Sequence, residues 1–139
     1  MSQDNLDFYL TFWDQVANKG RLDLIDQHFA ADYTFNSPSV SVSGLSEAKQ
    51  YYGALLGAFS DIEFTVDDAF ASGDKLAKRW TFRATHTGEL NGIEPTGKRI
   101  TLVGATLARM EDGKIAEERD FADDLGLMQQ LGVIDLEES

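Results

Sequence analysis

The sequence predicts an α+β fold: a cone-shaped, curved and mostly antiparallel β-sheet with three N-terminal helices packed on one face. Three observations favour this class. Patterns with helical spacing fill the first part of the chain, and alternating strand patterns fill most of the remainder. The strand patterns are joined by short turns, which suit antiparallel neighbours and are too short for parallel crossovers. A sheet of this kind would enclose a conical pocket.

The N-terminal part predicts three helices. Residues 5–20 carry apolar side chains at spacings of three and four, and Gly20 stands where a C-terminal cap would be. Residues 21–33 continue this spacing in a second, short helix. After a turn-rich loop, residues 46–61 predict a third helix with Ser46 as its N-cap.

The later part predicts about four strands and a final short helix. The strand patterns cover residues 62–71, 76–90, 100–110 and 115–122. The turn sequences "SGDK" and "EDGK" indicate hairpins, and the Gly/Pro-containing "NGIEPTGKR" indicates a longer loop. Residues 124–132 predict the final helix. We found no linker or repeat, so residues 1–139 are expected to form a single domain.

Composition excludes several partners and chemistries. The formal charge is −12, with 24 acidic against 12 basic residues, which argues against nucleic acid and an anionic membrane surface. The chain has no cysteine, and its two histidines are too far apart in sequence to suggest a metal site, so we expect no metal and no cofactor. The opening "MSQDNLDFYL" has no basic leader and no apolar run has membrane length, which favours a cytoplasmic protein.

Several motifs resemble one known family. "HTGEL", "GI.PTGKRI", "EDGKI" and "GLMQQLG" stand at family-like spacings, and "ADYTFNSP" and "GAFSDIEFTVDD" match upstream. Over residues 5–132 the chain resembles the SnoaL-like polyketide cyclases of the nuclear-transport-factor-2-like superfamily. The resemblance implies a cone-shaped fold, a homodimer formed through the sheet, and cofactor-independent aldol cyclisation of a small apolar or oxygenated carbonyl substrate, including polyketide-like compounds.

Asp120 is the first candidate for catalysis. The resemblance places the cyclase acid/base at this aspartate, where the strand that follows "DGKI" stops. A single carboxylate can remove a proton next to a carbonyl and later return it, provided that apolar neighbours such as Phe121 and Leu127 raise its pKa. The residues alone also allow a solvated charge or a helix cap, although Asp123 and Asp124 are better placed to cap.

Three polar residues are predicted to assist. The resemblance places a helping histidine where this chain has Thr106, which can hydrogen-bond to a substrate but cannot shuttle a proton. Strand alternation puts His86 on the same face as Trp80 and Phe82, so we predict that His86 also acts in catalysis at the pocket. Asn36 is either a turn residue or, as the resemblance implies, an anchor for a ligand oxygen.

Aromatic side chains are predicted to line the pocket and bind a flat substrate. Besides the two on the His86 strand, the candidates are Trp13, Tyr51 and Phe59, and each could equally serve only as core. Together with these residues, the resemblance implies a cyclase-type enzyme that uses acid/base chemistry.

Other functions stay open at this point. A hydroxylase-like enzyme, an isomerase or an epoxide hydrolase would use the same cone for different chemistry, and a non-catalytic module would bind a small molecule without turnover. The sequence does not indicate whether Glu118 faces the pocket. No lysine has a clearly buried setting, so no Schiff base is expected.

Overall fold

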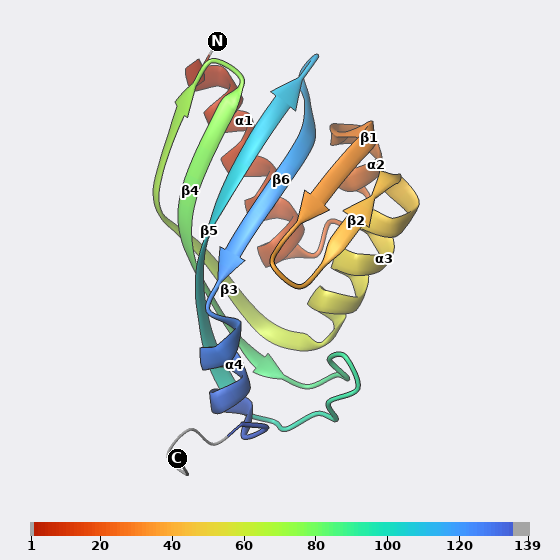
Figure 1. The fold of residues 1–139 in the computed structure, drawn as a ribbon, viewed down its shortest axis with the longest axis vertical. Helices are drawn as coiled ribbons and strands as arrows, with labels where there is room; N and C mark the ends of the chain where they lie inside the picture. The colour runs from red at the N-terminus through yellow and green to blue at the C-terminus, as the bar shows by residue number, and fades with distance from the viewer. Residues whose placement is uncertain (1, 135–139) are drawn as a thin grey trace.

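The computed structural model describes residues 2–134, which form a curved six-stranded sheet with helices on one face (Figure 1). The strand order is β2-β1-β6-β5-β4-β3, and every neighbouring pair is antiparallel except β1 and β6, which run parallel. The elements are α1 (Ser2–Trp13), a π-helical turn η1 (Asp14–Asn18), α2 (Leu24–His28), β1 (Phe29–Asn36), β2 (Ser41–Ser43), α3 (Gly44–Gly57), β3 (Phe59–Ser72), β4 (Lys75–His86), β5 (Arg99–Glu111), β6 (Lys114–Ala122) and α4 (Asp124–Leu131).

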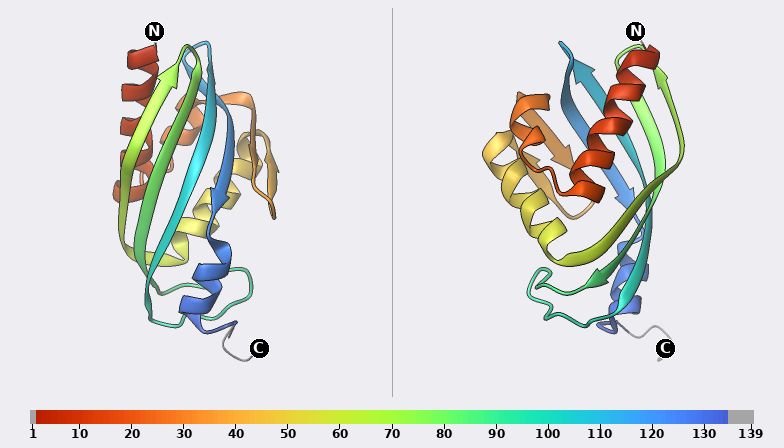
Figure 2. Two further views of the ribbon diagram at one scale, coloured as in Figure 1. Left: turned by 60° about the vertical axis from the view of Figure 1, so that its left-hand side comes forward. Right: turned by 180° about the vertical axis from the view of Figure 1, so that it is seen from behind.

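Helices α1 and α3 lie against the concave side of the sheet, and α4 closes one end of it (Figure 2). Tyr9 and Trp13 of α1 and Tyr52 of α3 are buried between these helices and the sheet. A second apolar cluster, which includes Phe82 and Leu127, fills the end covered by α4. The α+β cone predicted from the sequence is confirmed, and no helix within residues 2–134 is long and apolar enough to cross a membrane.

The stretch between the second and third helices differs from the prediction. Residues 29–36 form β1 and residues 41–43 form β2, where the sequence indicated the end of a helix and a loop. Phe29 continues the apolar spacing of α2, but Tyr33 and Phe35 follow with strand alternation and are buried. The strand forms because β1 pairs in parallel with β6, which lies far along the chain. This pairing decides between helical spacing and strand alternation, and no residue near β1 in the sequence indicates it.

Cap positions were predicted with mixed success. Gly20 adopts φ +68° and its N–H bonds to the carbonyl of Val16, as expected for a residue that ends a helix. The prediction for Ser46 is wrong, because α3 begins at Gly44 after the extended Ser43. Asp123 caps α4 by accepting a hydrogen bond from the Gly126 N–H at 3.0 Å.

Candidate active site

A cavity of about 100 Å³ lies between the concave face of the sheet and the helices. Its wall is largely aromatic and aliphatic, but four polar side chains also face it, from β4, β5 and β6. The lining residues are Trp13, Ala17, Tyr52, Leu55, Leu56, Phe59, Phe64, Lys78, Trp80, Phe82, Leu102, Thr106, Glu118, Asp120 and Leu127. An apolar hollow with a few converging polar groups is typical of a small-molecule site.

The sheet register brings three of these polar residues into one row. Lys78 on β4 is paired with Thr106 on β5, and Thr106 is paired with Asp120 on β6. Glu118 precedes Asp120 by two residues, so strand alternation places both carboxylates on the same face. The site therefore depends on three neighbouring strands of a regular sheet, a rigid support for side chains that must hold their positions.

Asp120 is held by a short hydrogen-bond chain. Thr106 Oγ1 donates to Asp120 Oδ1 at 2.5 Å, and Trp80 Nε1 donates to Thr106 Oγ1 at 2.9 Å. Among the described residues, Oδ2 of Asp120 has no hydrogen-bond partner. Burial, followed by the nearby charge of Glu118, raises the pKa of Asp120 to about 6, against smaller lowering effects from Thr106 and Lys78.

Glu118 is almost fully buried and accepts hydrogen bonds from three aromatic side chains. Tyr9 and Trp13 donate to Oε2, Trp13 at 2.9 Å, and Tyr33 donates to Oε1 at 2.8 Å. The hydroxyls of Tyr33 and Tyr52 are also hydrogen-bonded, 2.9 Å apart. Burial raises the pKa of Glu118, while Lys78 and the three donors oppose that effect. The open question about its orientation is thus resolved, since Glu118 faces the cavity.

Lys78 corrects the expectation that no lysine is buried. Only 5% of its surface is exposed, and Nζ lies 4.6 Å from the ring centre of Tyr9 and 5.0 Å from those of Trp13 and Phe64. Burial lowers the pKa of Lys78 to about 8, although the two carboxylates raise it. Lys78 stands two residues before Trp80, so strand alternation places both side chains on the same face. That spacing was the sequence signal that could have predicted the burial of Lys78.

Six of the nine predicted site residues line the cavity together: Trp13, Phe59, Trp80, Phe82, Thr106 and Asp120. The other three do not. Tyr51 packs against Phe35 with ring centres 5.1 Å apart, and its neighbour Tyr52 lines the cavity instead. Asn36 accepts a hydrogen bond from Ser41 Oγ at 2.8 Å, which ties β1 to β2.

His86 is the third, and it is completely buried at the end of β4. It follows the predicted alternation, but its ring packs against Phe59 at 5.7 Å, outside the cavity wall. Nδ1 accepts the backbone N–H of Thr96 at 3.1 Å, which leaves the proton on Nε2. Nε2 has no partner among the described residues. Within residues 2–134, no three His, Asp or Glu side chains are grouped as metal ligands would be.

The curved sheet and the helices on its concave side define a nuclear-transport-factor-2-like cone with an apolar cavity that two carboxylates line. The chain belongs to the SnoaL-like polyketide cyclase family, whose model matches residues 7–131. Both the fold and the family predicted from the sequence are therefore confirmed.

Named relatives support this assignment. Nogalonic acid methyl ester cyclase of Streptomyces nogalater is 28% identical over 120 residues, which cover 83% of this chain and 88% of that one. The structure of TsrD from Streptomyces laurentii has a TM-score of 0.86 at 25% identity and covers 96% of this chain and 99% of its own. AclR from Streptomyces galilaeus, a candidate hydroxylase, has a TM-score of 0.85 at 27% identity, with 97% and 100% covered.

Proposed function

We propose that this protein catalyses a cofactor-independent acid/base reaction, an intramolecular aldol cyclisation or a related enolisation, on a small carbonyl or polyketide-like substrate. The observation that carries the proposal is Asp120, a carboxylate with a raised pKa that lines an apolar cavity and whose Oδ2 has no hydrogen-bond partner within residues 2–134. A base whose pKa lies near neutral pH can both accept and return a proton. The methyl ester cyclase among the relatives supports this substrate class.

The reaction transfers one proton from the substrate to Asp120 and later returns it to the substrate. Asp120 Oδ2 removes a proton from the carbon next to a substrate carbonyl, and the resulting enolate carbon attacks a second carbonyl carbon of the same molecule. A carbon–carbon bond forms, the second carbonyl oxygen becomes an alkoxide, and protonated Asp120 returns the proton to that oxygen. Substrate and product are isomers, so no oxidant, reductant or leaving group is required.

Other cavity residues orient this carboxylate, raise its pKa and exclude water. Thr106 fixes Oδ1 of Asp120, and Trp80 fixes Thr106 in turn, so the carboxylate keeps its direction without a histidine. The charge on Glu118 raises the pKa of Asp120 and makes it a better base. The aromatic walls exclude water from the enolate and accept flat rings.

The test is direct turnover of candidate substrates. Purified protein would be incubated with nogalonic acid methyl ester or aklanonic acid methyl ester, each named in a relative, in buffer containing a chelator. Chromatography with mass detection would follow an isomer of unchanged mass. Asp120→Asn should abolish conversion, whereas Asp32→Asn, at an exposed strand position, should not. Unchanged turnover by Asp120→Asn would rule out the mechanism, and tight binding without turnover would indicate a non-catalytic module.

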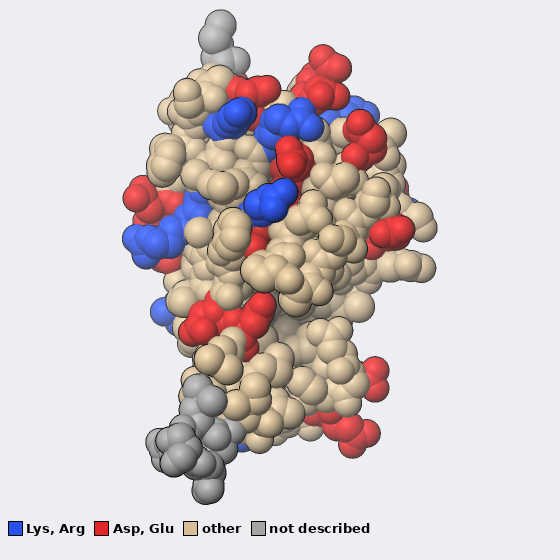
Figure 3. All heavy atoms as spheres, in the orientation of Figure 1, with Lys and Arg blue, Asp and Glu red and all other residues tan. Residues whose placement is uncertain are grey.

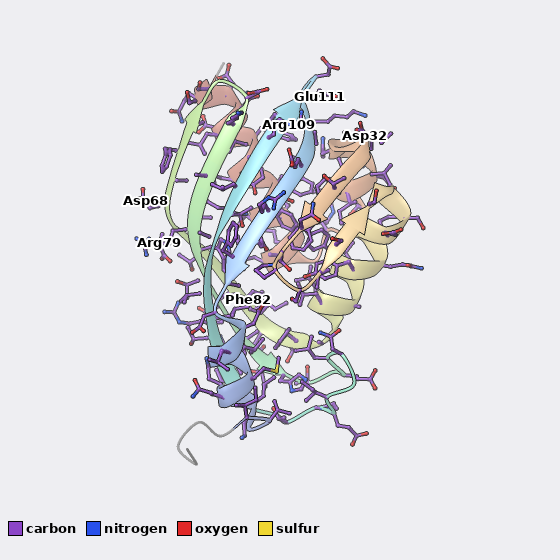
Figure 4. The ribbon with its side chains drawn as sticks, in the orientation of Figure 1. Asp32, Asp68, Arg79, Phe82, Arg109 and Glu111 are labelled. Carbon is purple, nitrogen blue, oxygen red and sulfur yellow. The ribbon has the colours of Figure 1, made fainter. Side chains whose placement is uncertain are left out.

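We also propose that two copies associate through the outer face of the sheet. Val103, Leu107 and Phe121 are 47%, 53% and 51% exposed there, on β5 and β6. Figure 3 shows this face: acidic and basic side chains are interspersed in the upper part of the view, and a largely uncharged area lies below them. Arg79 and Asp68 project outward near its edge, and Arg109 and Glu111 lie toward the end of β5 (Figure 4). Exposed apolar groups with charged neighbours suit an interface between copies.

Light scattering after gel filtration would test the dimer. Leu107→Glu should shift the protein toward a monomer, because it places a charge within the apolar patch. Leu125→Glu is the matched control, since Leu125 is equally exposed, at 50%, but lies on α4. A wild-type monomer at every concentration would refute the proposal.

A further inference from the structure

The proposed aldol mechanism leaves Lys78 without a role, although its amine reaches the same cavity. The side chain comes from the first half of β4, and Nζ lies near the rings of Tyr9, Trp13 and Phe64. Within residues 2–134, no hydrogen bond or ion pair to Nζ is found, and no carboxylate oxygen lies within 4.0 Å of it. Lys78 is therefore not simply the bonded partner of Glu118.

The surroundings favour a reactive amine. Removing an ammonium from water disfavours its charged form, and here that effect exceeds the attraction of Glu118 and Asp120, so the pKa of Lys78 falls to about 8. Near pH 7.5 about a quarter of the molecules would carry a neutral amine, compared with about one in a thousand for an ordinary lysine. Only the neutral amine has the lone pair that attacks a carbonyl.

A proton donor and acceptor lies on the same face. The register runs from Lys78 through Thr106 to Asp120, so their backbones are about 10 Å apart, two strand spacings. Both residues line the same cavity, and the long Lys78 side chain can span part of that separation. A carbinolamine must gain a proton on its hydroxyl before water can leave, and a carboxylic acid with a pKa near 6 can supply it.

We propose that Lys78 is a nucleophilic amine that condenses with small aldehydes or ketones in the cavity to form a protein-bound imine. The nitrogen bonds to the carbonyl carbon and loses a proton, and the carbonyl oxygen becomes a hydroxyl. That hydroxyl takes a proton and leaves as water, which gives a protonated carbon–nitrogen double bond. No electrons are gained or lost, and water reverses the step. This activity goes beyond the proposed cyclisation and does not depend on it.

Reductive trapping tests the proposal on the wild-type protein. Benzaldehyde, a flat probe that suits an aromatic cavity, would be added with cyanoborohydride near neutral pH, and hydride would convert the imine to a stable benzylamine. Peptide mapping by mass spectrometry would then report label at each lysine over time. We expect Lys78 to be labelled on the order of tenfold or more faster than exposed Lys75 on the same strand, because its free-amine fraction is larger.

Three variants make the test sharper. Lys78→Arg keeps the positive charge and Lys78→Met keeps the approximate volume, and both should remove the fast label, while Lys75→Met should retain it. Circular dichroism would show whether each variant folds, and the wild-type map decides the question even if one does not. Label at Lys78 that is absent, or no faster than at Lys75, would overturn the proposal. Cyclisation is read separately by chromatography, so the two proposals can fail independently.

Discussion

Replacing Asp120 with asparagine should remove activity and, at neutral pH, make the protein more stable. The pKa of Asp120 is about 6 in the fold against an ordinary 3.8. The folded value is the higher one, so its protonated form favours folding, and that advantage is lost as the pH rises through about 6. Asparagine resembles the protonated acid and still offers an oxygen to the Thr106 hydroxyl, so it avoids the cost of burying a charge.

The size of the effect follows from the two pKa values. They differ by about 2.2 pH units, and each unit corresponds to about 1.4 kcal/mol, so ionised Asp120 destabilises the fold by up to about 3 kcal/mol. The side chain keeps some contact with solvent, so we expect a gain of about 1 to 3 kcal/mol for Asp120→Asn near pH 8. For a chain of this length that is roughly 3 to 9 °C in Tm.

Denaturant unfolding at two pH values is the assay. The gain should be present near pH 8 and shrink below about 1 kcal/mol near pH 4, where Asp120 is protonated in the fold. Asp32→Asn, at an exposed position on β1, should show no such dependence. A loss of stability near pH 8, or a gain that is equal at both pH values, would refute the argument that burial raises this pKa.

Two further substitutions probe the surroundings of the base. Glu118→Gln removes a charge that raises the pKa of Asp120, so the acidic limb of the pH–rate profile should move to lower pH; an unmoved limb would show that burial alone sets this pKa. Gly104→Ala would put a methyl group 2.6 Å from the Trp80 ring and 2.9 Å from a backbone oxygen, and thermal melting should show a loss of about 1 to 3 kcal/mol. The control Gly57→Ala meets nothing within 4 Å, so an equal loss there would contradict the steric explanation.

Sequence patterns predicted most of the sheet because hairpins are local. Alternation and turn residues are sufficient to define β3 to β6 within a few residues, whereas Asp120, near the end of β6, was singled out by the family resemblance. The strands β1 and β2 were missed because β1 is held by β6, whose sequence lies far away. A short apolar run carries no sign of such a partner.

The cavity was predicted less completely for a similar reason. Glu118 and Lys78 look like ordinary surface charges in isolation, and only their tertiary neighbours show otherwise. The carboxylate is accepted into the core because Tyr9, Trp13 and Tyr33 come from two other elements to donate to it. His86 shows the opposite case, since correct alternation brought it to the inner face but beyond the cavity.

The central position of β6 has a consequence for how the chain folds during synthesis. β6 is the last strand to be made, yet it separates β1 from β5. Until it leaves the ribosome, the nascent chain can form only two partial sheets, each with an unpaired edge that could join a neighbouring chain. Closing the sheet also links distant parts of the sequence, which slows folding. Because Glu118 and Asp120 lie on this strand, Glu118 enters the core and Asp120 reaches the cavity in the same step that completes the sheet.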